Sequence, residues 1–223
     1  MKERDLLLAV DTSTHVASTA LYDGVCVRAE MTWEAPRRHT VELAPMVVSM
    51  LDRSRVRASD LGGLAVAVGP GSFTGLRIGL ALVKGLALAR GIPLVGVPTL
   101  DVTVYPVPHR RVPLYATLQA GRGRICVAPY RWRRGGWQQV GELALTTWGE
   151  LVAELPDSAL VCGEIDAGGV ELLQQNEKWS LAPPAQRLRR AGYLAELGWQ
   201  SLAQGVQDDP STLEPIYLHT VSS

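Results

Sequence analysis

The chain has 223 residues, 47% of them hydrophobic, which is enough to bury the core of one large domain or of two small lobes. Its 22 basic and 22 acidic residues cancel, so a surface that is electropositive throughout is excluded, although local basic patches are not. Three unclustered cysteines lack metal-ligand spacing and exclude a disulfide framework. No run reaches membrane-spanning length and the first apolar run is too short for a signal peptide, so we expect a cytoplasmic protein without a membrane contact.

The first third of the chain predicts a three-stranded meander followed by a helix. The predicted strands are the apolar runs at residues 6–10, 18–22 and 25–30. Asp23-Gly24 is a strong hairpin signal between the last two runs, and helical spacing of apolar residues follows from about 40 to 54. The polar run 11–14 (Asp-Thr-Ser-Thr) after the first strand either faces a phosphate or a hydrated Mg²⁺, or forms an ordinary Asx turn.

The central stretch 64–91 predicts a buried strand, a glycine-rich turn and a long helix. The strand ends at 69–71 (Gly-Pro-Gly), and Ser72 or Thr74 can cap the helix that follows, before a further strand at 94–97. Free N–H groups at such a turn attract anions, but many glycine-rich turns bind no ligand. The Gly-Lys-Ser/Thr of a P-loop is absent from this stretch. Phe73, the only phenylalanine, either fills the core or is offered to a partner.

The second half of the chain repeats this order of elements. Strands are predicted at 114–118, 124–130, 138–145 and 159–162, and helices at 148–154 and 188–204. A meander, a helix, a strand and a helix, found twice, are the plan of the α/β actin-like ATPase fold, which is ribonuclease H-like. We therefore predict two similar lobes, 1–105 and 106–223, each a mixed sheet flanked by helices, and allow the last helix and tail to pack back on the first lobe.

Four motifs resemble one known family, the TsaB (YeaZ) family. They are Ala-Val-Asp-Thr-Ser-Thr at 9–14, Arg38-His39, Gly-Pro-Gly-Ser-Phe-Thr-Gly-Leu-Arg-Ile-Gly at 69–79, and Lys-Gly-Leu-Ala at 84–87. The resemblance is dense over residues 6–105 and thinner afterwards, although 213–218 looks like the family's C-terminal ending. Members are the dimerisation subunits of the bacterial machinery that makes N6-threonylcarbamoyladenosine at position 37 of tRNAs reading ANN codons.

The resemblance implies a scaffold and activator without an active site of its own. Such a subunit binds TsaD together with TsaE, pairs with itself when TsaD is absent, and meets tRNA only through the complex. It implies no cofactor on the isolated chain, with ATP or ADP at the complex interface. The catalytic paralogue TsaD carries a His-x-x-x-His metal pair on the first helix, whereas this chain has His39 followed by Leu43, so we expect no metal here.

The second lobe also departs from the family pattern. Gln119 cannot offer the carboxylate that phosphotransferases of this fold hold near Mg²⁺, and Arg124 reverses a charge. The alternative is a stand-alone actin-fold enzyme, ATP-dependent or metal-dependent, that uses Asp11 and His39. Direct tRNA recognition is not expected to centre on this chain, and the arginine groups at 53–57, 131–134 and 187–190 are interpreted as solvated surface.

The resemblance also implies a partner-facing surface on the first two helices of the first lobe. Its predicted residues are Arg38, His39, Glu42, Leu43, Met46, Met50, Gly71, Ser72, Phe73, Thr74, Gly75, Leu76 and Arg77. Methionines suit a surface that must accept two partners, but the same periodicity also fits core positions. The residues expected closest to a nucleotide are Asp11, Thr12 and Ser13.

Overall fold

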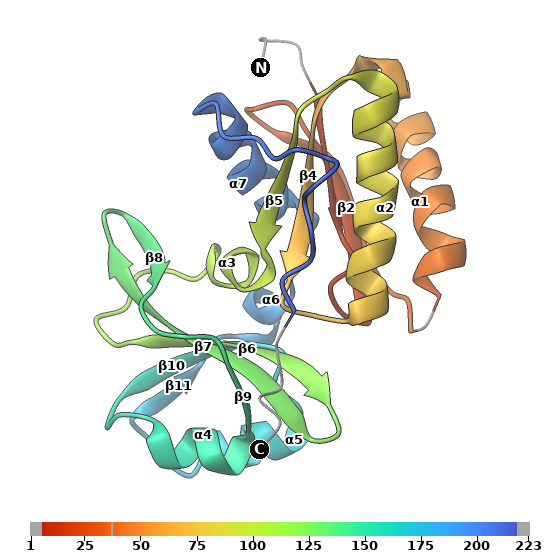
Figure 1. Ribbon diagram of the computed structural model, residues 1–223. Coiled ribbons are helices and arrows are strands. Elements are labelled where there is room, and N and C mark those ends of the chain that lie inside the picture. The colour runs from red at the N-terminus through yellow and green to blue at the C-terminus, as the bar shows by residue number, and fades with distance from the viewer. Residues whose placement is uncertain (1–5, 37, 218–223) are drawn as a thin grey trace. The chain divides into compact units, whose positions relative to one another are not determined.

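A computed structural model describes residues 6–36 and 38–217, and Figure 1 shows its helices and strands. Contacts between residues divide the chain into two compact units, which are described separately below. Of the described residues, the first unit holds 6–36, 38–102 and Arg190–Ile216, and the second holds Thr103–Arg189 and Tyr217. The chain thus leaves the first unit after its fifth strand and returns to it for a last helix.

The first unit is built on a five-stranded mixed sheet in the order β3-β2-β1-β4-β5. Its strands are β1 (Leu6–Asp11), β2 (Val16–Tyr22), β3 (Val27–Glu34), β4 (Leu61–Gly69) and β5 (Leu94–Pro98). The first three pair antiparallel, as the Asp-Gly hairpin signal predicts, and β4 and β5 run parallel to β1. The central β4 is aliphatic and almost wholly buried because helices cover both faces of the sheet.

Helices α1 (His39–Arg53) and α2 (Phe73–Arg90) lie on one face of this sheet, and α7 (Ala191–Ala203) lies on the other (Figure 1). The α1–α2 side buries Leu, Val and Met side chains, whereas the α7 side is rich in alanine. Small residues let α7 approach the sheet closely: a Cβ built on Gly198 would lie 2.5 Å from the Cβ of Ala65. The first unit has two further short elements, the 3₁₀ helix η1 (Ala58–Asp60) and α3 (Thr99–Val104), whose last two residues lie in the second unit.

The segment after α7 returns along the first unit and contacts β5, β4 and α2. The backbone N–H of Asp208 donates to the Leu94 carbonyl at 2.8 Å, and the Asp208 carboxylate accepts from the Gly96 N–H at 2.7 Å. Further along, the N–H of Ile216 donates to the Val68 carbonyl at 2.7 Å. Residues 208–216 are therefore held to the first unit by backbone hydrogen bonds.

The second unit repeats the plan of the first in a six-stranded sheet ordered β11-β10-β6-β7-β8, with β9 also pairing β7. Its strands are β6 (Leu114–Gly121), β7 (Arg124–Arg133), β8 (Gly136–Gln139), β9 (Ala144–Thr147), β10 (Ala159–Gly163) and β11 (Trp179–Leu181). Its helices are α4 (Trp148–Glu154), α5 (Ala167–Leu173) and α6 (Pro184–Arg187). The strand β6 corresponds to β1, β10 to β4 and β11 to β5, so the predicted repetition of the topology is present.

Several predicted boundaries differ from the structure. The strand predicted at 138–145 is two strands, β8 and β9, and Gly141 lies between them, where a Cβ would be 2.7 Å from the ring of Pro129. The last helix begins three residues later than predicted, at Ala191. Five short elements (η1, α3, α5, α6 and β11) were not predicted. No helix within the described residues is both long and apolar enough to cross a membrane.

Candidate functional site

The glycine-rich turn between β4 and α2 is shaped by backbone geometry and by one cap. Gly69 has φ +112°, a value that L side chains rarely adopt, and its N–H donates to the Thr99 hydroxyl at 3.1 Å. Ser72 is the N-cap of α2, since its hydroxyl accepts from the Gly75 N–H at 3.2 Å. Of the two capping residues predicted, Ser72 is the one that caps.

The glycines of this turn make room for the turn that follows β1. A Cβ built on Gly71 would lie 2.2 Å from the Ser13 carbonyl oxygen, and one on Gly75 would lie 2.1 Å from that of Thr12. Hydrogen bonds lock the two turns together: the Thr12 hydroxyl donates to the Gly75 carbonyl at 2.7 Å, and the Ser72 N–H donates to the Ser13 carbonyl at 2.6 Å. Gly75, predicted as a partner-surface residue, is therefore in close contact with the chain's own β1–β2 turn.

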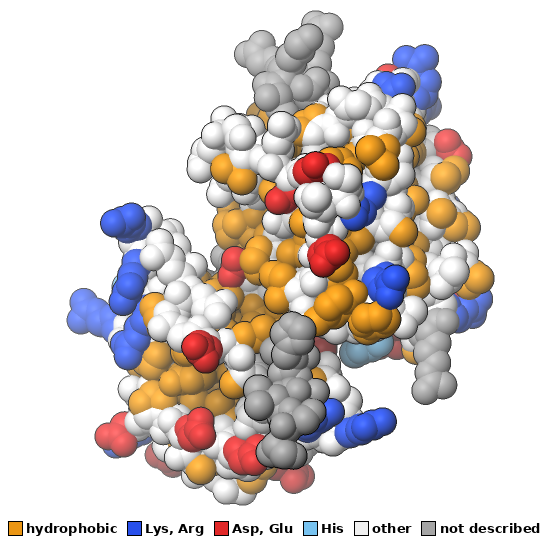
Figure 2. Space-filling view, in the orientation of Figure 1, with side chains coloured by type: hydrophobic (Ala, Val, Ile, Leu, Met, Phe, Trp, Pro, Cys, Tyr) orange, Lys and Arg blue, Asp and Glu red, His pale blue; other side chains and the backbone are white. Residues whose placement is uncertain are grey.

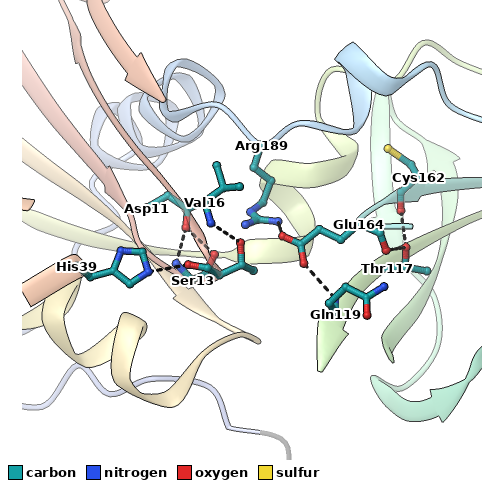
Figure 3. A network of polar contacts seen from close by, with 10 residues as sticks. Asp11, Ser13, Val16, His39, Thr117, Gln119, Cys162, Glu164 and Arg189 are labelled. Atoms are coloured by element: carbon teal, nitrogen blue, oxygen red, sulfur yellow. Dashed lines mark hydrogen bonds and ion pairs between the residues drawn. The ribbon is translucent and has the colours of Figure 1, made fainter. Parts of the chain in front are cut away.

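The polar run after β1 is buried and internally bonded. Asp11, Thr12 and Ser13 are each at most 1% exposed. One oxygen of the Asp11 carboxylate accepts from both the N–H and the hydroxyl of Ser13, which is an Asx turn (Figure 3). The ordinary turn considered from the sequence is thus present, and a nucleotide contact by these residues stays a prediction.

His39 lies inside the first unit at the start of α1. Its ring is 6% exposed, and Nε2 lies 2.8 Å from the carbonyl oxygen of Thr14, so a ring that carries its proton on Nε2 donates to that oxygen (Figure 3). His39 was predicted at the partner interface; in the first unit its side chain lies inside and ties α1 to the β1–β2 turn. No three His, Cys, Asp or Glu side chains among the described residues come together as metal ligands.

Burial also removes other residues from the predicted partner surface. Leu43, Met50, Gly75 and Leu76 are buried, with Leu43 at 2%, Met50 at 1% and Leu76 at 0% exposure, so they pack inside the first unit and do not lie on its surface. The helical spacing of Leu43 and Met50 marks the core-facing side of α1, which is the alternative that the periodicity left open. Met46 is half-buried.

The outward side of the same two helices is nevertheless apolar. On α1 the exposed residues recur at helical spacing, as Val41, Ala44, Pro45 and Val48. Val41, Val48, Phe73 and Leu88 are 54–68% exposed, and Figure 2 shows hydrophobic side chains along both helices. We call the surface formed by Val41, Ala44, Pro45, Val48, Phe73, Ala81 and Leu88 the α1–α2 face. Most of these residues lie outside the prediction from sequence, because the apolar periodicity of each helix marks its core-facing side.

Polar residues border the α1–α2 face. The guanidinium of Arg77 lies over the Phe73 ring, 5.1 Å from its centroid, beside a shallow groove of about 350 Å³ that also reaches Thr40. Arg38 is exposed and forms an ion pair with Glu42 at 2.8 Å. Gly71, Ser72 and Thr74 are exposed as well. An apolar centre with a polar rim is the usual composition of a protein-binding surface.

In the second unit, the corresponding turn is also internally bonded. The Gln119 N–H donates to the Glu164 carboxylate at 3.0 Å (Figure 3). The Gln119 side-chain amide donates to Asp166 at 3.2 Å. The other oxygen of Glu164 forms an ion pair with the buried Arg189 at 3.2 Å. Both carboxylates near Gln119 thus have partners within the unit. Arg124 is half-buried in β7.

Comparison with known proteins assigns the fold just described to a family. The model of the TsaD family, tRNA N6-adenosine threonylcarbamoyltransferase, matches residues 31–164. The tRNA threonylcarbamoyladenosine biosynthesis protein TsaB of Bacillus subtilis (strain 168) is 30% identical over 217 residues, which cover 95% of this chain and 93% of that protein. The chain belongs to the TsaB (YeaZ) family.

Other TsaB relatives differ in how much of the chain they match. The TsaB protein of Escherichia coli (strain K12) is 44% identical over 94 residues, or 42% of this chain, and the match spans 40% of that relative's length. The solved structure of YeaZ from Pseudomonas aeruginosa is 26% identical, has a TM-score of 0.77, and covers 96% of this chain and 100% of that one. Two further solved structures, 10% and 13% identical with TM-scores of 0.51 and 0.50, share the fold alone, which is the actin-like ATPase fold.

Proposed function

We propose that this TsaB-family chain is a non-catalytic subunit for tRNA threonylcarbamoyladenosine biosynthesis and that it binds TsaD through the α1–α2 face. Membership of the TsaB family supports the pathway, since relatives carry that biosynthesis in their names. The observation that carries the proposal is the run of exposed apolar side chains on two adjacent helices. Contiguous exposed apolar surface on a soluble domain is a mark of protein–protein contact.

The match to the TsaD family model supports a partner of the same fold. That match begins at residue 31 and so includes both helices of the face. A partner with the same two helices can pair with them about a pseudo-twofold axis, and a second copy of this chain can do the same about a true one. We therefore propose that the α1–α2 face pairs with itself when TsaD is absent, and that TsaE joins the TsaD-bound form.

The buried state of the polar residues supports the absence of an active site on this chain. One oxygen of the Asp11 carboxylate accepts from Ser13, and Nε2 of His39 lies against the Thr14 carbonyl. Both side chains are buried, so neither faces an exposed substrate as a general base or a ligand. A nucleotide, if the family pattern holds, is then bound by the complex and not by the isolated chain.

The test compares two valine-to-glutamate variants in the same unit. Val48 lies on the α1–α2 face, and Val25 is 85% exposed in the β2–β3 turn away from it. Val48→Glu leaves an unpaired carboxylate in the interface, so we expect at least about a 100-fold loss of TsaD affinity, from the lost apolar contact and the buried charge. Val25→Glu is expected to bind TsaD normally.

Retained folding of both variants is checked by circular dichroism, and a threonylcarbamoylation assay with each component omitted tests the activator role. Leu76 is unsuitable for this test, because a charge at a fully buried position would unfold the unit. Normal TsaD capture by Val48→Glu would overturn the proposed surface. ATP turnover by the isolated chain would instead favour the stand-alone enzyme.

A further inference from the structure

Positive charge is concentrated in one segment of a chain whose net charge is zero. Between Asp101 and Glu142 the sequence has no acidic residue and seven arginines. This segment runs from α3 through the β7–β8 hairpin and lies almost entirely in the second unit. Segregation of this kind produces a local positive potential that the balanced total conceals.

The structure brings five of these arginines to one region of the second unit. Arg110 and Arg111 lie in the loop before β6, and Arg131, Arg133 and Arg134 lie on the β7–β8 hairpin. Figure 2 shows Lys and Arg side chains gathered over this hairpin and this loop, at the left of the view. We call these five arginines, with His109, Trp132 and Trp137, the Arg–Trp surface.

Aromatic contacts hold the loop and the hairpin together. Trp132 and Trp137 are opposite each other across the β7–β8 ladder, and their rings meet edge to face with centroids 5.5 Å apart. The exposed His109 ring lies 5.1 Å from Trp132, and the Trp137 indole N–H donates to the Val107 carbonyl at 2.8 Å. The hairpin is therefore a supported ribbon that carries the arginines at fixed spacing.

The charges of the Arg–Trp surface are not neutralised by neighbours. All five arginines are exposed, and within residues 6–36 and 38–217 none of them forms an ion pair. Arginines elsewhere do find partners, as Arg189 does with Glu164 and Arg190 with Glu30. Five unpaired guanidinium groups close together repel one another, so an anionic ligand would relieve this repulsion.

We propose that the Arg–Trp surface binds the phosphate backbone of RNA. The planar guanidinium group matches phosphate oxygens with two parallel hydrogen bonds, and an exposed aromatic ring such as His109 offers a face to a base. An anionic membrane is the less suitable partner, because both tryptophans are half-buried in the hairpin contacts and present no apolar wedge. The inference goes beyond the scaffold function and does not depend on TsaD binding.

The salt dependence of binding follows from the number of arginines. With about 0.7 counterions released for each phosphate contact, five contacts give a slope of about −3.5 in log affinity against log salt. Affinity then falls about 100-fold between 50 and 200 mM NaCl. Such binding is weak at physiological salt, so the surface adds affinity to a larger complex and does not capture RNA alone.

The experiment is a fluorescence-anisotropy titration of the isolated chain against an unmodified transcript of a tRNA that reads ANN codons. Arg131→Gln with Arg133→Gln removes two contacts, so we expect a slope near −2.1 and only about a 20-fold loss over the same salt range. The matched control is Arg53→Gln with Arg55→Gln, two exposed arginines of the first unit, and it is expected to behave as the unchanged chain. Arg131→Lys with Arg133→Lys keeps both charges and should keep the slope.

Three outcomes would overturn the inference: no tRNA binding at 50 mM NaCl, an equal loss in the control pair, or arginine-dependent binding to vesicles of phosphatidylserine and phosphatidylcholine without binding to tRNA. Circular dichroism of each variant shows whether the second unit is folded. The titration contains no TsaD, so its result does not depend on TsaD binding. Either the RNA titration or the TsaD capture can fail while the other succeeds, and the two proposals are therefore tested separately.

Discussion

The fit of Gly75 against the turn after β1 predicts that a single methyl group weakens the first unit. Gly75→Ala would put a Cβ 2.1 Å from the Thr12 carbonyl oxygen, whereas ordinary contact begins at 3.4 Å, so the two groups must separate by 1.3 Å. Gly85, on the same helix, has nothing within 4 Å of its Cβ position. Gly85→Ala is therefore a matched control with the same chemical change and free space around it.

The expected cost can be built from its parts. Overpacking of a fixed backbone costs about 1–3 kcal/mol. A separation of 1.3 Å also breaks the bonds from the Thr12 hydroxyl to Gly75 and from the Ser72 N–H to Ser13, at about 1 kcal/mol each. Replacing glycine by alanine within a helix stabilises the fold by at most about 1 kcal/mol, so the Gly75→Ala variant is about 2–4 kcal/mol less stable than the unchanged chain. Gly85→Ala has the same helix stabilisation without the steric cost, so we expect it to be about 0.5–1 kcal/mol more stable than the unchanged chain.

Thermal unfolding followed by circular dichroism measures the difference. At about 2–4 °C for each kcal/mol, we expect the midpoint of Gly75→Ala to fall by about 4–16 °C and that of Gly85→Ala to rise by about 1–4 °C. A Gly75→Ala variant that melts at or above the unchanged chain would refute the argument, because the space around Gly75 would then not be limiting.

Two further predictions concern the tail and the cysteines. The Lys84 ammonium donates to the Leu213 carbonyl at 2.8 Å, so Lys84→Met should loosen the tail by about 1.5 kcal/mol and speed its limited proteolysis about tenfold; an unchanged cleavage rate would contradict this role. Burial raises the pKa of the Cys126 and Cys162 thiols to about 12, so at pH 8 only about one in ten thousand of each is the reactive thiolate. A thiol reagent should then label the exposed Cys26 quickly and the other two only after unfolding, and fast labelling of all three would contradict their burial.

Long elements with strong periodicity were predictable from the sequence, and most short ones were not. The helix α4 is the exception: its seven residues have the predicted bounds, and Thr147 and Glu150 form a capping box at its start. The break between β8 and β9 was missed; Gly141 lies within it, against Pro129 of a neighbouring strand, and such a contact leaves no local pattern in the sequence. Elements of three to seven residues, such as β11 and α5, have too few residues to show a period.

The candidate site was predictable in its location but not in its orientation. The motif at 69–79 pointed to α2, yet a helix has two sides, and only the packed structure shows that Leu76 faces the sheet while Phe73 faces outward. The role of His39 could not be found from spacing, because its partner is a backbone carbonyl 25 residues earlier in the chain. Contacts between segments distant in sequence leave no local pattern to interpret.

The return of the chain to its first unit has a consequence for synthesis on the ribosome. The alanine-rich face of the first sheet is covered by α7, which leaves the exit tunnel after residues Thr103–Arg189. Those residues hold the strands β6–β11 of the second unit in one contiguous stretch, so they can begin to fold while the first unit still exposes that face. A fragment that stops after β5 would keep this apolar face uncovered, and an expression boundary for the first unit must include residues 190–216.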